Sequence, residues 1–153
     1  AALKAAAAGA GASAHFGQVL ELLQSDGAGD VRHRAAEAAA ATAEGAGRER
    51  EAIAALECAL GDEYAPLRTA AARGLGVLQA AAAAPKLGGC LTDPHMSVRS
   101  ACLLALGELG QDAAGQAEVV AAQMRVPLIR TEAILALGKL GKAGAAHVSE
   151  ILE

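Results

Sequence analysis

The sequence contains four histidines, a residue type that often binds metal ions or transfers protons. They stand far apart, at His15, His33, His95 and His147. No two of them have the spacing of one helical turn, and neither an HExxH nor a Cys-x-x-Cys motif occurs. The pattern therefore predicts no metal site, and we expect these side chains to lie in solvent or in turns.

Three cysteines, Cys58, Cys90 and Cys102, are the strongest nucleophiles in the chain. Their odd number and irregular spacing are not those of a disulfide framework, so the sequence favours an intracellular, reducing compartment, with cytoplasm and organelle not distinguished. We expect the three thiols to be buried and to pack as small hydrophobic groups.

Other catalytic motifs are missing as well. The Gly-x-Gly fragments never extend to a dinucleotide or phosphate-binding fingerprint, and no serine lies in a Gly-x-Ser-x-Gly setting. The sequence thus predicts no catalytic residue and no cofactor, and we expect a protein that is not an enzyme.

Composition excludes further classes of protein. The chain has 153 residues, of which 54% are hydrophobic, and this content is too high for a disordered chain. A formal net charge of −4, with one Tyr, one Phe and no Trp, argues against a nucleic-acid partner. No apolar run reaches the roughly 18 residues that a transmembrane helix needs.

A repeated pattern organises most of the sequence. The segment LTDPHMSVRSACLLALGELG, residues 91–110, aligns with IRTEAILALGKLG, residues 129–141, and the same frame includes the segments that follow Leu60 and Asp26. Four arginines come into register, Arg32, Arg68, Arg99 and Arg130, with spacings of 36, 31 and 31 by subtraction. Repeats of this length predict stacked helical hairpins.

Each copy divides into two helical stretches. After the aligned arginine, apolar residues recur at intervals of three and four, as in Val98, Ala101, Cys102, Ala105, Leu106 and Leu109. First helices are expected at 16–23, 48–60, 85–91 and 116–124, with a further one at 147–153. The opening segment, 3–10, has the pattern of a second helix. Alternation typical of strands is missing.

We therefore predict an all-α solenoid of about four stacked helix hairpins, forming one domain over residues 1–153. The expected units are 14–46, 47–82, 83–113 and 114–144, with partial units at 1–13 and 145–153. Asp93-Pro94 predicts a helix start, and Gly110 and Gly141 predict helix ends. Gly76, Gly107 and Gly138 are expected where neighbouring helices approach closely.

The string LTDPHMSVRSACLLALGELG resembles the HEAT repeat, in particular the short variety of phycobilin lyases. That resemblance implies a ladder in which an aspartate and an arginine pair between adjacent units. Carried over by position, its residues are Asp26, Asp62 and Asp93 with Arg32, Arg68, Arg99 and Arg130. The fourth unit has Met124 in place of the aspartate, and we expect the ladder to stop or to change partner there.

Positions that vary while the core stays fixed predict a protein-binding face on the second helices. The chosen residues are Arg34, Arg73, Leu104, Glu108, Leu135 and Lys139. Leu104 and Leu135 occupy equivalent places in consecutive units and are flanked by Glu108 and Lys139, which is typical of a contact patch. Burial of both leucines in the core is the alternative.

These observations favour a noncatalytic protein-interaction or scaffold module with a protein partner. Because the repeat pattern stops within a unit at both ends, we expect a peripheral subunit or fragment of a larger hetero-complex. The alternative is a chromophore-lyase-like enzyme or its partner subunit, which rests on fold analogy with phycobilin lyases.

Overall fold

The computed structural model describes residues 15–152, and every regular element within that range is helical. A helix over 15–25 is followed by α2 (Gly29–Ala46), α3 (Glu49–Ala59), α4 (Ala65–Val77), α5 (Ala84–Gly89), α6 (Met96–Leu109), α7 (Ala117–Ala122), α8 (Arg130–Lys139) and α9 (Lys142–Leu152). Short 3₁₀ turns extend α5 and α7 at both ends: η1 (Ala81–Ala83), η2 (Cys90–Thr92), η3 (Gly110–Gln116) and η4 (Gln123–Arg125); η5 (Pro127–Ile129) precedes α8.

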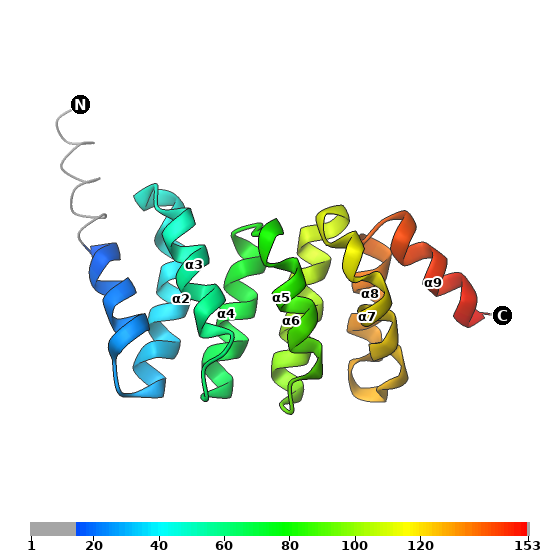
Figure 1. Ribbon diagram of the computed structural model, residues 1–153, viewed down its shortest axis with the longest axis horizontal. Helices are drawn as coiled ribbons and strands as arrows, with labels where there is room; N and C mark the ends of the chain where they lie inside the picture. Colours follow the sequence, from blue (N-terminus) through cyan, green and yellow to red (C-terminus); the bar gives the residue numbers. More distant parts are fainter. Residues whose placement is uncertain (1–14, 153) are drawn as a thin grey trace.

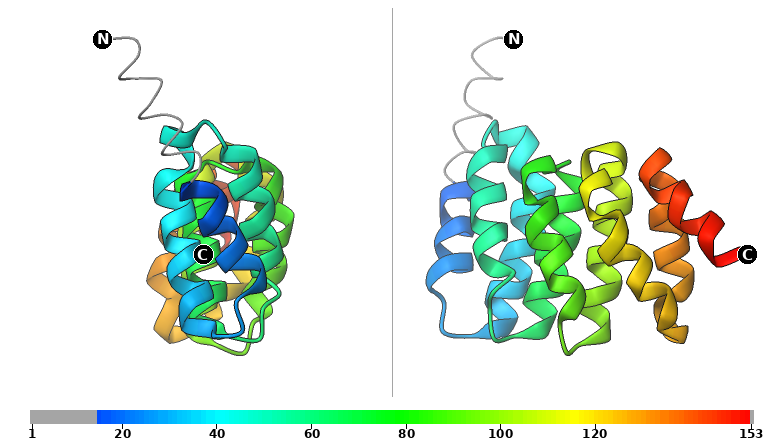
Figure 2. Two further views of the ribbon diagram at one scale, coloured as in Figure 1. Left: turned by 90° about the vertical axis from the view of Figure 1, so that its left-hand side faces the viewer. Right: turned by 45° about the vertical axis from the view of Figure 1, so that its right-hand side comes forward.

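The helices form a two-layered stack (Figure 1). The second helix of each hairpin packs on the next, so α2 contacts α4, α4 contacts α6, and α6 contacts α8. The other layer holds the helix over 15–25 together with α3, α5, α7 and α9, and the right-hand view of Figure 2 shows the same order along the stack. The prediction of an all-α hairpin solenoid is confirmed.

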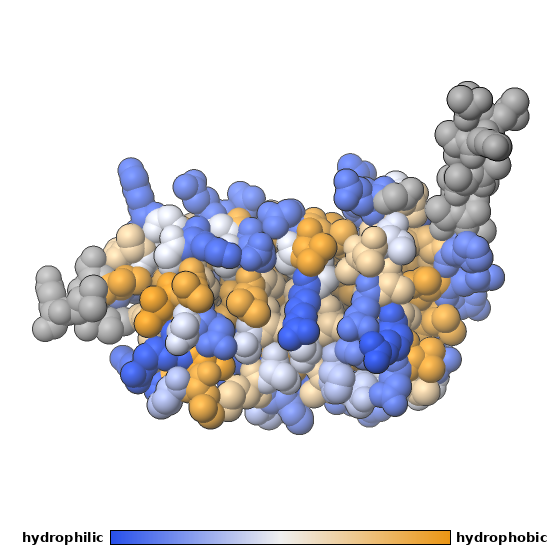
Figure 3. Space-filling view, turned by 180° about the vertical axis from the view of Figure 1, so that it is seen from behind, coloured by the Kyte–Doolittle hydropathy of each residue, from blue (hydrophilic) through white to orange (hydrophobic). Residues whose placement is uncertain are grey.

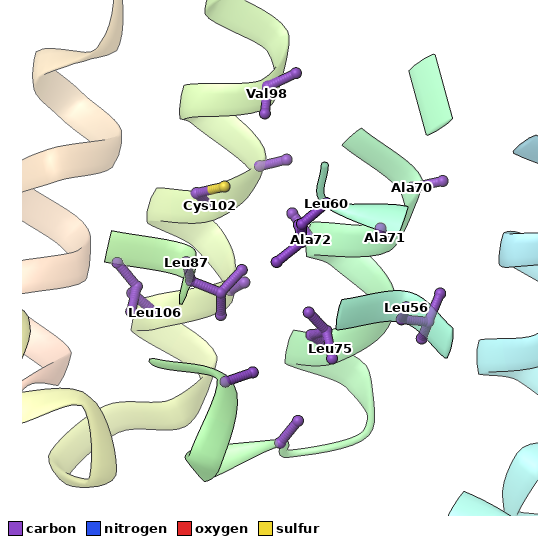
Figure 4. Packing of buried hydrophobic residues seen from close by; sticks show 14 of the residues in the cluster. Leu56, Leu60, Ala70, Ala71, Ala72, Leu75, Leu87, Val98, Cys102 and Leu106 are labelled. Atoms are coloured by element: carbon purple, nitrogen blue, oxygen red, sulfur yellow. The ribbon is translucent and has the colours of Figure 1, made fainter. Parts of the chain in front are cut away.

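The core runs along the seam between the two layers. Leu56 of α3, Leu75 of α4, Leu87 of α5 and Leu106 of α6 are all fully buried and gather between adjacent hairpins (Figure 4). The predicted buried face of α6 is confirmed, since all six of its residues are at most 4% exposed. Alanines supply much of the remaining interior, which allows the helices to lie close together.

Helix ends follow the predicted glycines in two of the four units. Gly110 after α6 and Gly141 after α8 have φ angles of 56° and 72°, in the left-handed region that glycine adopts without strain. The equivalent place after α4 holds Gln79, also with a positive φ of 51°. Its side-chain amide donates a hydrogen bond to the Gly76 carbonyl, which helps to hold this conformation.

Two predicted helix starts are wrong. Asp93-Pro94 does not begin α6, which starts at Met96; the Asp93 carboxylate instead accepts a hydrogen bond from the His95 amide and shapes the turn before the helix. The last described helix starts at Lys142, five residues before His147, because the small residues after Gly141 continue as helix against α8. The predicted helix at 3–10 lies outside the described residues.

Candidate protein-binding surface

The aligned arginines have one contact in common. Each donates a hydrogen bond to the backbone carbonyl six residues earlier, at O···N distances of 2.6–2.9 Å. The acceptors are the carbonyls of Asp26, Asp62, Asp93 and Met124. Each arginine therefore holds the loop before its own helix in place. The contact does not depend on an aspartate side chain, because Arg130 makes it with the carbonyl of Met124.

The aspartate carboxylates pair with the arginine of the preceding unit. Arg32 donates two hydrogen bonds to Asp62, at 2.9 and 3.1 Å, and Arg68 donates two to Asp93, at 2.7 and 3.0 Å. Both pairs are largely buried, with the side chains of Arg68 and Asp93 about a tenth exposed. Paired guanidinium and carboxylate groups in this geometry tie one hairpin to the next.

Burial by itself would raise the pKa values of Asp62 and Asp93. Three effects together outweigh burial: the hydrogen bonds from the arginines, those from the backbone amides of Tyr64 and His95, and the positive charge of the guanidinium groups. As a result the pKa of each carboxyl lies below its ordinary value. The same pairing raises the pKa values of Arg32 and Arg68.

The ladder of ion pairs ends at the third unit. Arg99 donates to the carbonyls of Asp93 and Pro94, at 2.6 and 3.3 Å, and no carboxylate of the described residues pairs with it. Met124 stands where the next unit would supply the aspartate, and its side chain is buried. The Asp26 carboxylate accepts a hydrogen bond from the Ala28 amide, and no arginine of the described residues pairs with that carboxylate.

The ladder carboxylates predict how stability depends on pH. In the unfolded chain an aspartate has a pKa of about 3.9, whereas Asp62 and Asp93 have lower values in the folded protein. Their contribution to stability is therefore complete above about pH 5 and is lost as the pH falls through 4 and below the folded values. We expect the thermal midpoint to drop over that range, and Asp62→Asn/Asp93→Asn to flatten the profile.

The proposed binding residues lie on the outer face of the second helices. Leu104 of α6 is 45% exposed and Leu135 of α8 is 58% exposed, so the alternative of burial in the core is wrong. Glu108 and Lys139 form an ion pair at 2.8 Å beside them, linking α6 to α8. This face is seen in Figure 3, where apolar side chains gather toward the C-terminal half of the stack.

The remaining predicted residues lie nearer the N-terminus, on the second helices of the first two units. Arg73 of α4 is exposed. Arg34 of α2 is exposed as well and pairs with Glu37 at 3.0 Å within its own helix. Val77, at the end of α4, is 70% exposed. We call Val77, Leu104 and Leu135, with the Glu108–Lys139 pair, the α4–α8 patch.

Sequence reasoning missed the exposed apolar residues near the C-terminal end. Leu128, in η5 before α8, is 71% exposed and Ile134 of α8 is 43% exposed. The repeat alignment places Ile134 among core residues, since its equivalents Ala36, Ala72 and Leu103 are fully buried. Ile134 differs from its equivalents because no further second helix packs on α8 within the described residues.

The three cysteines differ in their environments. Cys102 is buried, Cys90 is half-buried and Cys58 is exposed, so the prediction of three buried thiols is wrong for Cys58. A hydrogen bond from the Cys102 thiol lowers the pKa of Cys90 to about 7, against the opposing effect of burial, and the same interaction raises the pKa of Cys102. Of these two interacting thiols, Cys90 therefore has the greater thiolate character near neutral pH.

This hydrogen bond predicts a pH profile for alkylation. In a Cys58→Ser background we expect iodoacetamide to label Cys90 with a rate midpoint near pH 7. Cys102→Ala removes the donor, so the midpoint moves up toward the ordinary thiol value of about 8.5. Peptide mass spectrometry after timed quenching measures both rates, and identical midpoints would contradict the assignment.

Within residues 15–152, no group of three or more His, Cys, Asp or Glu side chains is arranged to hold a metal ion. His33 contacts the Pro66 carbonyl through Nδ1 at 3.0 Å, and His95 lies exposed before α6. None of the described helices combines the length and the apolar character that a bilayer crossing needs.

The stacked hairpins, their repeated arginines and their small-residue contacts define an α-solenoid. In a comparison with protein families, the family described as HEAT repeats matches residues 53–117, from within α3 to the start of α7. The match does not single out the phycobilin-lyase type. No curated protein matches the chain. HEAT repeats generally mediate protein–protein interaction and are typically noncatalytic.

Proposed function

We propose that this protein is a noncatalytic scaffold module that binds a protein partner through the α4–α8 patch, as a peripheral subunit of a larger assembly. The observation that carries the proposal is the exposure of Leu104 and Leu135 on consecutive second helices. Apolar side chains that lie next to one another on a rigid scaffold, with charged residues at the edge, are typical of contact surfaces.

The chemistry of the patch indicates what kind of segment it suits. Val77, Leu104 and Leu135 offer aliphatic contacts on three successive helices, while Arg73 and Lys139 add positive charge. Glu108 is already paired with Lys139, whereas Arg73 forms no ion pair with a carboxylate of the described residues. We infer that the partner presents an apolar segment with acidic residues beside it.

No observation favours the chromophore-lyase alternative. A conjugated tetrapyrrole needs aromatic or other flat apolar surfaces, and the sequence has one Phe and one Tyr. Phe16 is 1% exposed, and the ring of Tyr64 packs against Gly29 while its hydroxyl donates to Asp30. Phe16 therefore offers no exposed ring face, and Tyr64 lines a pocket of about 420 Å³ together with charged side chains, Asp30, Arg32 and Glu63.

Affinity capture with a patch that carries two introduced negative charges tests the proposal. We expect wild-type protein, used as bait in extract of its native source, to retain a defined partner that Leu104→Glu/Leu135→Glu loses. The matched control is Leu22→Glu/Val119→Glu, because these side chains are similarly exposed, 43% and 42%, but lie on the other helix layer. Equal retention by both double variants would overturn the assignment of this face.

The partner identified in this way allows a quantitative second measurement. Titration calorimetry with the purified partner should show a dissociation constant at least tenfold higher for Leu104→Glu/Leu135→Glu. The control should have the same dissociation constant as wild type. Circular dichroism melts of both variants show whether each is still folded, so that a loss of binding caused by unfolding can be recognised. A free bilin that gave a stoichiometric change in visible absorbance would favour the lyase alternative instead.

A further inference from the structure

Two of the three cysteines contact each other within the third hairpin, which α5 and α6 form. Cys90 lies in η2, at the end of the first helix of this hairpin, and Cys102 lies on α6. The thiol of Cys102 donates a hydrogen bond to the sulfur of Cys90, so the two sulfur atoms are neighbours. A disulfide can form only between cysteines whose side chains approach each other, and these two meet that condition.

The two thiols differ in their access to solvent. Cys102 is 0% exposed, and Figure 4 shows it on α6 among core residues such as Leu87 and Leu106. Cys90 packs against the same core but is only half-buried. A reagent in solvent therefore reaches Cys90 first, while Cys102 is placed to react with whatever forms there.

The charges around Cys90 belong to the ladder. Asp93 raises the pKa of the Cys90 thiol, whereas Arg68, which is paired with Asp93, lowers it. The hydrogen bond from Cys102 has a larger effect than either charge and brings the pKa of Cys90 to about 7. A large fraction of Cys90 is therefore thiolate at neutral pH, and the thiolate is the form that reacts with oxidants.

We propose that a hydroperoxide oxidises Cys90 and that Cys90 and Cys102 then form a reversible disulfide, which links the two helices of the third hairpin. In the first step the Cys90 thiolate attacks the peroxide: an S–O bond forms, the O–O bond breaks, and the leaving oxygen takes a proton from water. The product is a sulfenic acid at Cys90.

In the second step the Cys102 sulfur attacks the Cys90 sulfur. An S–S bond forms, the S–O bond breaks, and the Cys102 proton leaves with the hydroxyl group as water. The two sulfur atoms together lose two electrons, which the O–O bond of the peroxide accepts. A small dithiol restores both thiols by exchange.

The disulfide closes a short loop that contains the ladder residue Asp93. Cys90 and Cys102 are twelve positions apart by subtraction of their numbers, and the turn between them holds the carboxylate that binds Arg68. A bond that closes such a loop stabilises the folded state mainly by restricting the unfolded chain. The oxidised protein is therefore the more stable form, and oxidation makes the third hairpin more rigid.

Peptide mapping of the whole 153-residue protein tests the proposal. The protein is treated with stoichiometric hydrogen peroxide, blocked with N-ethylmaleimide and digested with trypsin. Trypsin cleaves after Arg99, between the two cysteines, so the disulfide joins peptide 87–99 to peptide 100–125. We expect this linked pair in the mass spectrum after peroxide, and its disappearance after dithiothreitol.

Three variants separate the two steps. Cys58→Ser is the matched control and should give the same yield of linked peptides, because Cys58 lies on α3 in the preceding hairpin. Cys102→Ala should give no link and should accumulate a sulfenic acid at Cys90, which dimedone traps. Cys90→Ser should give neither the link nor a dimedone adduct on the buried Cys102. Circular dichroism melts check that each variant is folded.

Thermal melts measure the effect of the bond itself. We expect the midpoint of the oxidised wild-type protein to lie about 5 °C or more above that of the reduced protein, and dithiothreitol to reverse the shift. Links that involve Cys58, or a sulfinic acid at Cys90 with Cys102 still reduced, would overturn the proposal, as would a midpoint that does not rise. No partner protein takes part, so the result is independent of the α4–α8 patch.

Discussion

We expect Arg68→Ala to lower the free energy of unfolding by about 3 kcal/mol, the largest effect of any single side-chain truncation in the ladder. The substitution leaves the buried Asp93 carboxylate without its two guanidinium hydrogen bonds. It also frees the carbonyls of Asp62 and Glu63, which Arg68 holds at 2.7 and 2.9 Å. Removal of one member of a buried ion pair costs about 3–5 kcal/mol, and the slight exposure of this pair places it at the lower limit.

The chain itself supplies the matched control. Arg99 occupies the equivalent position one unit later and binds two backbone carbonyls but no carboxylate. Arg99→Ala should therefore cost only about 1 kcal/mol, the usual value for lost hydrogen bonds of this kind. Urea unfolding of both variants measures the difference, and equal losses would mean that the carboxylate pairing adds nothing to stability.

The second large effect concerns the glycines of the second helices. We expect Gly76→Leu to destabilise the protein by about 2–3 kcal/mol, because the Cβ alone would lie 3.0 Å from the Ala105 Cα and the remaining atoms have no space. Since the obstacle is backbone, α4 and α6 must separate to admit the side chain. At the equivalent Gly138 of α8, no described atom lies within 4 Å of where its Cβ would be, so the same substitution should instead stabilise the isolated protein by about 0.5–1 kcal/mol through helix propensity.

Opposite signs for one substitution at equivalent positions make this comparison sensitive. Differential scanning calorimetry should place the midpoint of Gly76→Leu below that of wild type and the midpoint of Gly138→Leu above it. For a chain of this size, 1 kcal/mol corresponds to a shift of about 2–4 °C. A loss of stability in Gly138→Leu would show that the end of α8 is covered in solution.

Much of the architecture can be predicted from the sequence, because the copies of the repeat can be aligned with one another. The four arginines fix the register, and apolar residues at intervals of three and four then identify the buried face of α6. Helix starts were harder to predict. Asp93 and Pro94 satisfy the usual rules for a helix start, yet the Asp93 carboxylate binds the His95 amide and Arg68, so it shapes a turn outside the helix.

Whether a residue of the candidate sites is exposed depends on its position within the stack. Local sequence patterns do not contain that information. Ile134 and Leu103 occupy the same place in the repeat, and only the packing of a following helix buries one of them. Exposure of Cys58 likewise depends on how α3 faces solvent, while its neighbours Leu56 and Ala59 are buried. Leu104 and Leu135 could be selected from sequence because both vary against a constant core.

The contact of each arginine with the carbonyl six residues earlier occurs in all four units, but the carboxylate link to the next unit is missing after Arg99. The arginine–carbonyl contact thus stabilises every hairpin from within, whereas arginine–aspartate pairs connect only the first three hairpins to one another. In a linear array, cooperativity depends on that nearest-neighbour coupling. Amide exchange should consequently report fraying of α8 and α9 before α4 and α6 open, so that the protein unravels from its C-terminal end.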